Sequence, residues 1–556
     1  MFSSIGPIAL ALLITTLCAQ ARASYLDDVG YTALYGELGP TIPTGAGIRI
    51  SQVEAEEDPN THAYAPAHAS FPTKSIIYKS GTYPASSHAT IVGGYLYGPS
   101  GADGGMNPVE LYAATSNSNG WLGGGYLHLL NPAVPNVEIS RIENHSWIGD
   151  LGSFNEEILR RLDFAINRDG FLAVVGVNNG SDNPVPPLLA SSYNALSVGR
   201  TDGIHSAGFT TADGSGRIKP EIVAPLTATS WTTSLVSGIA GDLLEVADSR
   251  SGLADARNHS QVLKAILMAG ATKQQLPGWN RTATRPLDEV FGSGQVSLYN
   301  SYHILTGGEF APAPAANLPG RAVGDGWNLG TLTTGSPEQL YFLNVPAGMA
   351  LRDFSTVLNW NRISAQDPNN LWSSSLANLD LQLMTASNFV LGSTVDVSQS
   401  TVDNVEHIYR GAADPNLPAT TNELLPGQYA LRVQADFTGT GLTAADYALA
   451  WRGSLVVENP GAVEVPGDYN LDGLVDGLDF LVWQSNYFQT TSATLLQGDG
   501  TGDGLVDGLD FLTWQAGYQG FTASLGMTAQ SLALLPEPAT ALLLLAAAAV
   551  LRRRRR

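Results

Sequence analysis

The first half of the chain alternates continuous apolar runs with stretches of helical periodicity. Apolar runs bounded by glycine-rich turns occupy residues 47–53 and 170–177, and helical stretches occupy residues 154–167 and 234–247. A continuous apolar run is typical of a strand that is buried on both faces, as in a parallel sheet. The alternation therefore predicts an α/β domain over residues 24–306.

The hydrophobic pattern then changes to a period of two. Residues 307–325 are rich in Pro, Gly and Ala, which predicts a linker. From 326 to 458 apolar and polar residues alternate, most clearly at 379–383 and 429–433. Such alternation predicts an all-β sandwich. Residues 425–433 resemble the closing strands of small jelly-roll domains appended to secreted peptidases, and a generic sandwich accounts for the pattern equally well.

An internal repeat fills most of residues 466–522, where the segment 467–484 recurs as 498–515. Each copy has oxygen-bearing side chains at loop positions 1, 3, 5, 9 and 12, and a glycine at position 6 for a sharp turn. Ca²⁺ takes six to eight oxygen ligands, and the position-7 carbonyl completes such a set. The repeat therefore predicts two calcium ions. The predicted ligands are Asp468, Asn470, Asp472, Leu474, Asp476 and Asp479 in the first loop, and Asp499, Thr501, Asp503, Leu505, Asp507 and Asp510 in the second.

Two features distinguish this repeat from helix–loop–helix calcium sensors. Position 12 is Asp rather than Glu, and only the exiting helices, over 478–485 and 509–516, are obvious. In both respects the segment resembles the dockerin module over its whole length. The resemblance implies a small α domain and a cohesin-like partner, or else a calcium-stapled unit that attaches to another envelope protein. The alternative interpretation is an acidic turn repeat that binds no metal.

The N-terminal segment predicts export. In residues 1–23 an apolar stretch precedes Ala-Arg-Ala at 21–23, which is a small-x-small cleavage pattern of a secretory signal peptide. Cleavage there removes Cys18, the only cysteine in the sequence. A disulfide framework and a cysteine-ligated zinc site are therefore excluded.

The C-terminal segment predicts a sorting signal. In residues 535–556, Pro-Glu-Pro precedes an apolar run that is shorter than the roughly 20 residues of a stable span, and five arginines follow. This order resembles the PEP-CTERM signal of bacterial envelope proteins, whose tail an exosortase recognises and removes. The alternative is an ordinary C-terminal membrane anchor. The two ends predict an exported protein of the cell envelope or extracellular matrix, with its tail in the membrane before processing.

Composition and charge restrict the partners. The 556 residues include 60 Gly and 31 Pro, and only 14% are charged, which favours a turn-rich, β-containing protein. Acidic residues outnumber basic ones 50 to 28, for a net charge of −22. Such a surface repels phosphate backbones, so nucleic-acid binding is disfavoured, while divalent cations are compatible with it.

Four segments of the α/β domain carry residues suited to hydrolysis, in the order acid, histidine, amide, serine. The segments are residues 47–54, 87–94, 174–180 and 216–234. They resemble, in that order, the motif strands and helix starts of subtilisin-like serine peptidases, and residues 144–147 resemble the strand that lines the family's substrate groove. The resemblance implies a peptide or protein substrate. It assigns Glu54, where the family has Asp, as the acid, His88 as the base, Ser230 as the nucleophile and Asn178 as the oxyanion donor.

Each of these residue types has a physical reason in that chemistry. A serine hydroxyl is a weak nucleophile until a neighbouring imidazole takes its proton. A carboxylate must hold the imidazole in one tautomer. A tetrahedral oxyanion needs preorganised donors, which the Asn178 side chain and the Ser230 backbone N–H at a helix start would provide.

Several positions depart from the family pattern. Glu54 is one methylene longer than Asp, although a longer carboxylate can still orient an imidazole. It also stands near other carboxylates in sequence, which predicts a pKa raised by like-charge repulsion. Those neighbours are Glu56, Glu57 and Asp58, and the other departures are Val177, Ala228 and Ser234.

These observations leave three hypotheses. The first is a secreted serine endopeptidase with a Glu54/His88/Ser230 triad. The second is a catalytically inactive pseudopeptidase, whose fold serves as a binding or adhesion module for a partner or for extracellular polysaccharide. The third is a matrix protein whose α/β segment is a different hydrolase, with these three residues far apart.

Overall fold

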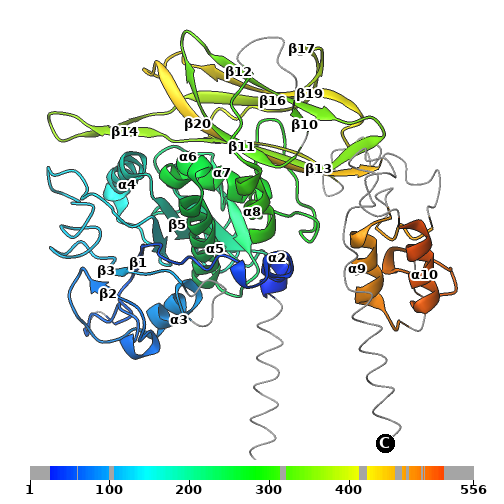
Figure 1. Ribbon diagram of the computed structural model, residues 1–556. Helices are drawn as coiled ribbons and strands as arrows, with labels where there is room; N and C mark the ends of the chain where they lie inside the picture. Colours follow the sequence, from blue (N-terminus) through cyan, green and yellow to red (C-terminus); the bar gives the residue numbers. More distant parts are fainter. Residues whose placement is uncertain are drawn as a thin grey trace, which may run out of the picture. The chain divides into compact units, whose positions relative to one another are not determined.

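Figure 1 shows the computed structural model of the chain. The structure describes residues 25–518 except 59, 99–104, 314–320, 323, 412–422, 458–465, 471–474, 490–492 and 494. The predicted signal peptide, the predicted sorting tail and the predicted ligands Asp472 and Leu474 lie outside the described residues. The chain divides into two compact units, Met1–Val456 and Val457–Arg556.

A seven-stranded parallel sheet forms the centre of the first unit, in the order β2-β3-β1-β4-β5-β6-β9. Its strands are β1 (Ile50–Glu54), β2 (Ile76–Tyr78), β3 (Val109–Ala113), β4 (Ile142–His145), β5 (Leu172–Gly176), β6 (Leu196–Arg200) and β9 (Ile222–Ala224). A short hairpin of β7 (Gly208–Phe209) and β8 (Ile218–Lys219) stands beside it. In open parallel sheets, sites form outside the carboxyl ends of the strands.

Helices cover both faces of this sheet (Figure 1). One face packs against α3 (Ser87–Leu96), α5 (Thr229–Ser249), α7 (Ser260–Gly270) and α8 (Leu298–Gly307), and the other against α4 (Asn155–Asp169). In β5, Leu172 and Val174 enter the first core, while Ala173 and Val175 enter the second. Because successive side chains of a strand point to opposite faces, a strand buried on both faces is apolar at every position.

Short helices complete the α/β part. These are α2 (Tyr31–Leu38), α6 (Ala254–Asn258), η1 (Gly39–Thr41), η2 (His68–Ser70), η3 (Gly152–Phe154) and η4 (Ser251–Leu253). Within the described residues, no helix is both long enough and apolar enough to cross a membrane.

Two antiparallel sheets form a sandwich in the same unit. The four-stranded sheet has the order β11-β20-β13-β18, and the five-stranded sheet, in which β10 pairs parallel to β12, has the order β10-β12-β19-β16-β17. The strands are β10 (Arg321–Ala322), β11 (Gly326–Thr333), β12 (Glu338–Val345), β13 (Met349–Trp360), β16 (Asn378–Ser387), β17 (Val390–Ser398), β18 (Val405–Arg410), β19 (Gly427–Asp436) and β20 (Ala444–Val457), with a hairpin of β14 (Ile363–Gln366) and β15 (Trp372–Ser375). The predicted α/β domain and the predicted β-sheets are confirmed.

The sandwich and the α/β part share one hydrophobic core. The four-stranded sheet turns one face to the sandwich interior and the other to α7 and α8. Trp327, Val357 and Ala450 from this second face lie fully buried in the core that also holds Leu267 of α7. The indole N–H of Trp327 donates to the Leu305 carbonyl of α8 (3.1 Å). The α/β part therefore completes its core with residues from β11, β13 and β20.

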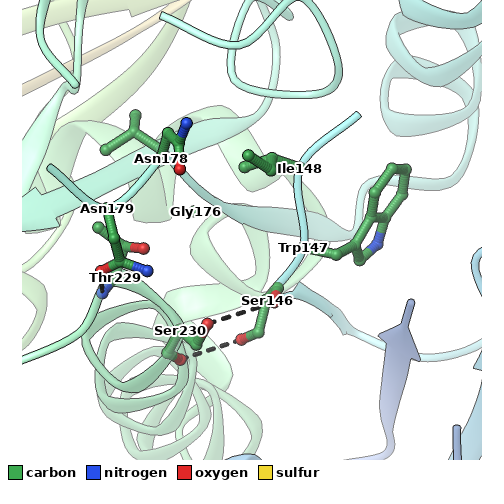
Figure 2. A pocket seen from close by; sticks show the side chains of 9 residues that line it. Ser146, Trp147, Ile148, Gly176, Asn178, Asn179, Thr229 and Ser230 are labelled. Carbon is green, nitrogen blue, oxygen red and sulfur yellow. Dashed lines mark hydrogen bonds between the residues drawn. The ribbon is translucent and has the colours of Figure 1, made fainter. Parts of the chain in front are cut away.

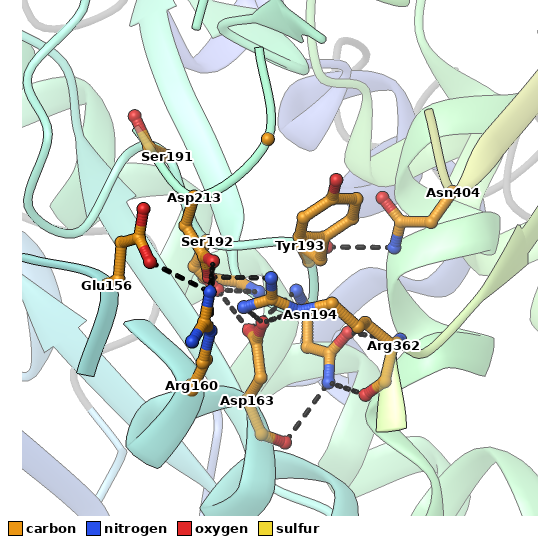
Figure 3. Close-up of polar contacts among 12 residues, drawn as sticks. Glu156, Arg160, Asp163, Ser191, Ser192, Tyr193, Asn194, Asp213, Arg362 and Asn404 are labelled. Atoms are coloured by element: carbon orange, nitrogen blue, oxygen red, sulfur yellow. Dashed lines mark hydrogen bonds and ion pairs between the residues drawn. The ribbon is translucent and has the colours of Figure 1, made fainter. Parts of the chain in front are cut away.

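A buried polar network reinforces this contact (Figure 3). Arg362, in the turn after β13, donates from Nε to Asp163 Oδ2 (2.8 Å) and pairs with Asp213 Oδ2 (2.6 Å). Its backbone exchanges two hydrogen bonds with the Asn194 side chain, and Asn404 Nδ2 donates to the Tyr193 carbonyl (2.9 Å). Arg362 is only 3% exposed. Removing one partner of such a buried pair leaves an uncompensated charge, which is strongly destabilising.

The second unit contains α9 (Gly477–Asn486), η6 (Leu495–Gln497) and α10 (Gly508–Gly517). Both helices begin with a capping box, Asp476 with Asp479 in α9 and Asp507 with Asp510 in α10. Each box satisfies backbone N–H groups that have no partner within the first helical turn. The two copies of the repeat therefore begin their helices in the same way, while the assignment to a dockerin-like module stays a prediction.

Candidate active site

Three of the predicted site residues meet at the carboxyl end of the central sheet. Glu54 is the last residue of β1, His88 is the second residue of α3 and Ser230 is the second residue of α5. Glu54 Oε2 lies 2.8 Å from His88 Nδ1, and His88 Nε2 lies 2.9 Å from Ser230 Oγ. The structure therefore brings together residues that are 34 and 142 positions apart in sequence.

Local hydrogen bonds fix where α3 begins and hence where His88 stands. The side chain of Ser86 accepts from the Ala89 backbone N–H (3.0 Å), as an N-cap residue does. The Ser87 backbone N–H donates to Glu57 Oε2 (2.6 Å). Glu57 therefore stabilises the helix start with its negative charge, as expected at the positive end of a helix dipole.

The start of α5, which presents Ser230, is held by two residues from neighbouring segments. The Thr229 backbone N–H donates to Asn179 Oδ1 (3.0 Å), and Ser146 Oγ donates to the Ser230 carbonyl (3.0 Å). Within the helix, Ser234 Oγ also donates to the Ser230 carbonyl (2.7 Å). The Ser234 side chain, one of the departures noted above, is thus accommodated by a hydrogen bond inside α5.

Electrostatics couple the acid to the base. Burial raises the pKa of Glu54, and the hydrogen bond from His88 opposes that shift. The hydrogen bond to Glu54 raises the pKa of His88, against the effect of burial. The prediction that Glu56, Glu57 and Asp58 raise the pKa of Glu54 by like-charge repulsion is wrong about the cause. Burial of Glu54 raises its pKa, and Glu57 turns to the start of α3.

Asn178 lies across a small pocket from Ser230 (Figure 2). It follows β5, and its backbone N–H donates to Ser206 Oγ (2.9 Å). The pocket has a volume of about 70 Å³. Its lining consists of Ser146, Trp147, Ile148, Gly176, Val177, Asn178, Asn179, Thr229 and Ser230. All four predicted catalytic residues therefore lie at one site, three in a hydrogen-bonded chain and the fourth in the adjoining pocket.

This arrangement can perform nucleophilic chemistry. Ser230 Oγ is within hydrogen-bond distance of an imidazole nitrogen that can take its proton, and the opposite nitrogen faces a carboxylate. The pocket beside Ser230 offers polar groups to a carbonyl oxygen. The indole ring of Trp231 lies 5.4 Å from the His88 ring and covers part of the imidazole.

Sequence reasoning missed several residues that position this site. Asn179 and Ser146 hold the start of α5, although they stand next to residues that were singled out. Gln52, two residues before Glu54 on the same strand, donates a hydrogen bond to the Glu54 carboxylate. The signal in the sequence is a polar side chain two positions before the acid, because residues i and i+2 of a strand share a face.

Several described members of the predicted calcium-ligand sets accept backbone hydrogen bonds within their own loops. In the second loop, Asp499 Oδ1 accepts from the Gly502 backbone N–H (2.7 Å), and Asp510 Oδ2 accepts from the Asp507 backbone N–H (2.7 Å). Asp479 of the first loop accepts from Asn470 (2.9 Å) in the same way. Across the part of the chain that the structure describes, no three acidic, histidine or cysteine side chains converge into a metal site. The donor types suit Ca²⁺, and the two calcium ions stay a prediction.

No protein-family model matches the chain, and no curated protein matches its sequence. Among solved structures, the chain is similar to the serine protease of Aeromonas sobria (12% identity, TM-score 0.32), over 74% of this chain and 89% of that one. It is also similar to fervidolysin from Fervidobacterium pennivorans, a keratinolytic enzyme related to subtilisin (12% identity, TM-score 0.33), over 66% and 67%. A shorter likeness, to the pre-peptidase C-terminal domain of a Bacillus anthracis collagenase (16% identity, TM-score 0.16), covers 24% and 99%. Likenesses at these identities and TM-scores do not show what the chain does, so the function is argued from the geometry of the site.

Proposed function

We propose that this chain is a serine endopeptidase that hydrolyses peptide bonds through Glu54, His88 and Ser230. The observation that carries the proposal is the continuous chain of two hydrogen bonds, 2.8 Å and 2.9 Å long, that joins these three side chains at the carboxyl end of the sheet. Nucleophile, base and orienting acid stand in the order that acyl transfer requires.

In the proposed reaction, Ser230 Oγ attacks the carbonyl carbon of a peptide bond and its proton passes to His88 Nε2. Glu54 holds the imidazole through Nδ1 and stabilises the imidazolium that forms. The tetrahedral oxyanion is bound by the Asn178 side chain and the Ser230 backbone N–H. His88 then gives its proton to the leaving amine, and water hydrolyses the Ser230 ester by the same route.

Labelling with a fluorophosphonate probe, followed by peptide mapping, tests the assembled site. We expect covalent modification at Ser230, with no labelling and no peptide hydrolysis in Ser230→Ala or His88→Ala. The matched control is Ser336→Ala, an exposed serine in a turn of the sandwich, which should label like the parent chain. Absence of labelling in a folded chain would favour the inactive pseudopeptidase, whose function would then be to bind a partner or extracellular polysaccharide.

For the second unit we propose a calcium-binding attachment module. The support is the duplicated loop with its oxygen donors and the matching capping boxes of α9 and α10. In this proposal two Ca²⁺ ions order the loops, and a cohesin-like partner or another envelope protein binds the ordered unit.

We also propose that the chain is exported and sorted to the cell envelope or extracellular matrix. This rests on the sequence of its two terminal segments alone, the N-terminal cleavage pattern and the Pro-Glu-Pro tail with its arginines. Mass spectrometry of the mature protein would show cleavage after Ala23 and loss of the tail by an exosortase-type enzyme. Recovery of both termini intact would contradict it.

A further inference from the structure

The hydrogen-bonded chain at the active site continues beyond Glu54 into the protein interior. Gln52 Nε2 donates to Glu54 Oε1 (2.8 Å), and the Tyr97 hydroxyl donates to Gln52 Oε1 (2.5 Å). Gln52 Nε2 also donates to the Ala89 carbonyl in the first turn of α3 (3.0 Å). Gln52 and Tyr97 are both fully buried. The line of contacts therefore runs from Tyr97 through Gln52, Glu54 and His88 to Ser230.

The two oxygens of the Glu54 carboxylate have separate partners. Oε2 faces His88 Nδ1, and Oε1 accepts from Gln52. Gln52 reaches it because residues two apart on a strand share a face. The carboxylate is consequently held at both ends, and it can neither rotate about its last bond nor retract from His88 without losing a buried hydrogen bond.

Tyr97 determines which way the Gln52 amide points. A phenol beside the amide oxygen and a carboxylate beside the amide nitrogen satisfy both ends. Reversing the amide would place its oxygen against Glu54 Oε1, acceptor against acceptor, and its NH₂ against the phenol and away from the Ala89 carbonyl. Burial makes such an unpaired arrangement costly. Tyr97, the C-cap residue of α3, therefore keeps a donor aimed at Glu54.

We propose that Gln52 is a positioning residue that allows a glutamate to serve as the acid of the triad, with Tyr97 holding Gln52 in the required orientation. Glutamate has one more rotatable bond than aspartate, so fixing its carboxylate takes an additional partner, which Gln52 provides. Gln52 touches no substrate and acts only through Glu54. This inference rests on the proposed peptidase function, because it assigns a role within that triad.

Gln52→Leu removes the amide donor and puts an apolar side chain of similar size in its place. We expect kcat for peptide hydrolysis to fall about 10–100-fold, the usual effect of losing a hydrogen bond that orients a functional group, with KM unchanged. Tyr97→Phe keeps the ring and should lower kcat in the same direction but less. Ser51→Ala is the matched control, because Ser51 is buried in the same strand but bonds to Ser140 on the opposite face.

A double-mutant cycle separates positioning from a merely structural role. Gln52 also ties β1 to α3 through Ala89, so a fold effect would persist when Glu54 is absent. We expect Gln52→Leu to have no further effect on kcat in a Glu54→Ala background, because its action passes through that carboxylate. An equal loss in both backgrounds would overturn the proposal.

The pKa of His88 gives a readout that does not depend on turnover. In a Ser230→Ala background, with histidine labelled by ¹⁵N, Gln52→Leu should lower the His88 pKa toward its ordinary value, because a loosened Glu54 supports the imidazolium less well. If the parent chain fails to hydrolyse peptides but this shift appears, the positioning role stands and the peptidase function falls. An unchanged His88 pKa together with an unchanged kcat would overturn the positioning role alone.

Discussion

At the scale of single residues, the site depends on how Glu54 and His88 share a proton. Burial makes the Glu54 carboxylate costly to ionise, and His88 offsets that cost by a hydrogen bond that is strongest when the imidazole is charged. The pair therefore favours the charged imidazolium, which is the form that the proposed attack by Ser230 requires. The closeness of Glu56 and Glu57 in sequence predicts instead that repulsion sets the pKa of Glu54. That prediction fails because the sequence does not show that the Glu57 side chain turns to the start of α3.

The pH dependence of hydrolysis follows from this pair. Activity needs neutral His88, and its pKa is raised, so the rising limb of kcat/KM against pH should lie above about 6.5, the ordinary histidine value. Glu54→Gln should move this limb to lower pH and reduce the plateau by about 10⁴-fold, through loss of the charge and of the correct tautomer. A pH–rate profile of both chains checks this. If the rising limb lay at the same pH in both chains, Glu54 would not raise the pKa of His88, and the prediction would be wrong.

Asn178 offers a second prediction at the same scale. Removing its side-chain amide by Asn178→Ala should lower kcat about 10²–10³-fold with little change in KM, because the lost hydrogen bond forms only to the oxyanion. Steady-state kinetics on a peptide substrate measures the effect. Asn117→Ala, an exposed amide in the loop after β3, is the control. Comparable losses in both variants would argue against a specific oxyanion donor.

At the scale of elements, hydrophobic periodicity predicts that a helix or strand is present more reliably than it predicts the residue at which the element begins. The helix expected over 234–247 begins five residues earlier, at Thr229, so Ser230 lies in its first turn. Polar residues in its first two turns hide the periodicity of the helix, since Thr232, Thr233 and Ser234 are buried but not apolar. The start is fixed by Asn179, which lies in the loop after β5 and leaves no signal in the sequence of the helix itself.

The turn between β13 and β14 holds the sandwich to α4 through Arg362, which carries a stability prediction. Arg362→Met leaves the buried carboxylates of Asp163 and Asp213 without this partner and should lower the free energy of unfolding by about 3–5 kcal/mol. Arg352→Met is the matched control, because its ion pair with Glu423 is largely exposed and should contribute about 0–1 kcal/mol. Denaturant unfolding measures both. Equal, small losses would mean that the network of Figure 3 does not stabilise the contact.

The calcium loops carry a prediction that is independent of the active site. Titration calorimetry of the full chain should give two Ca²⁺ bound per molecule, and Asp499→Ala should reduce this to one, because position 1 of the second loop is lost. Asp446→Ala, an exposed carboxylate of β20, serves as the control. Binding of no calcium by the parent chain would leave the repeats as turn structures held by their own backbone hydrogen bonds.

At the scale of the whole molecule, the α/β part and the sandwich share one hydrophobic core, so we expect them to unfold as one cooperative unit. The sequence suggested two domains joined across residues 307–325, because composition changes sharply there. β13 contains the opposing signal, since its last seven residues, 354–360, are all buried. Polar residues such as Ser355 and Asn359 occupy the face toward the α/β part, so hydrophobicity alone did not reveal that both faces are covered.

A fragment experiment tests this unit directly. Residues 25–306 expressed alone should fail to fold or should expose apolar surface, because Trp327, Val357 and Ala450 are missing from their core. Residues 25–457 should unfold in one calorimetric transition. Dye binding to exposed apolar surface and calorimetry provide the measurements, and an independently stable, active 25–306 fragment would contradict the shared core.

The position of β20 in the sequence has a consequence for the timing of folding. Ala448 and Ala450 belong to the core that the sheet helices also line, yet they are synthesised long after Ser230 has left the ribosome. A growing chain thus carries its nucleophile, base and acid for some 220 residues of synthesis before the surface that completes their scaffold exists. Under the proposed peptidase function, we expect activity to appear only after residues up to 450 have been synthesised, because the core beneath the site is incomplete until then.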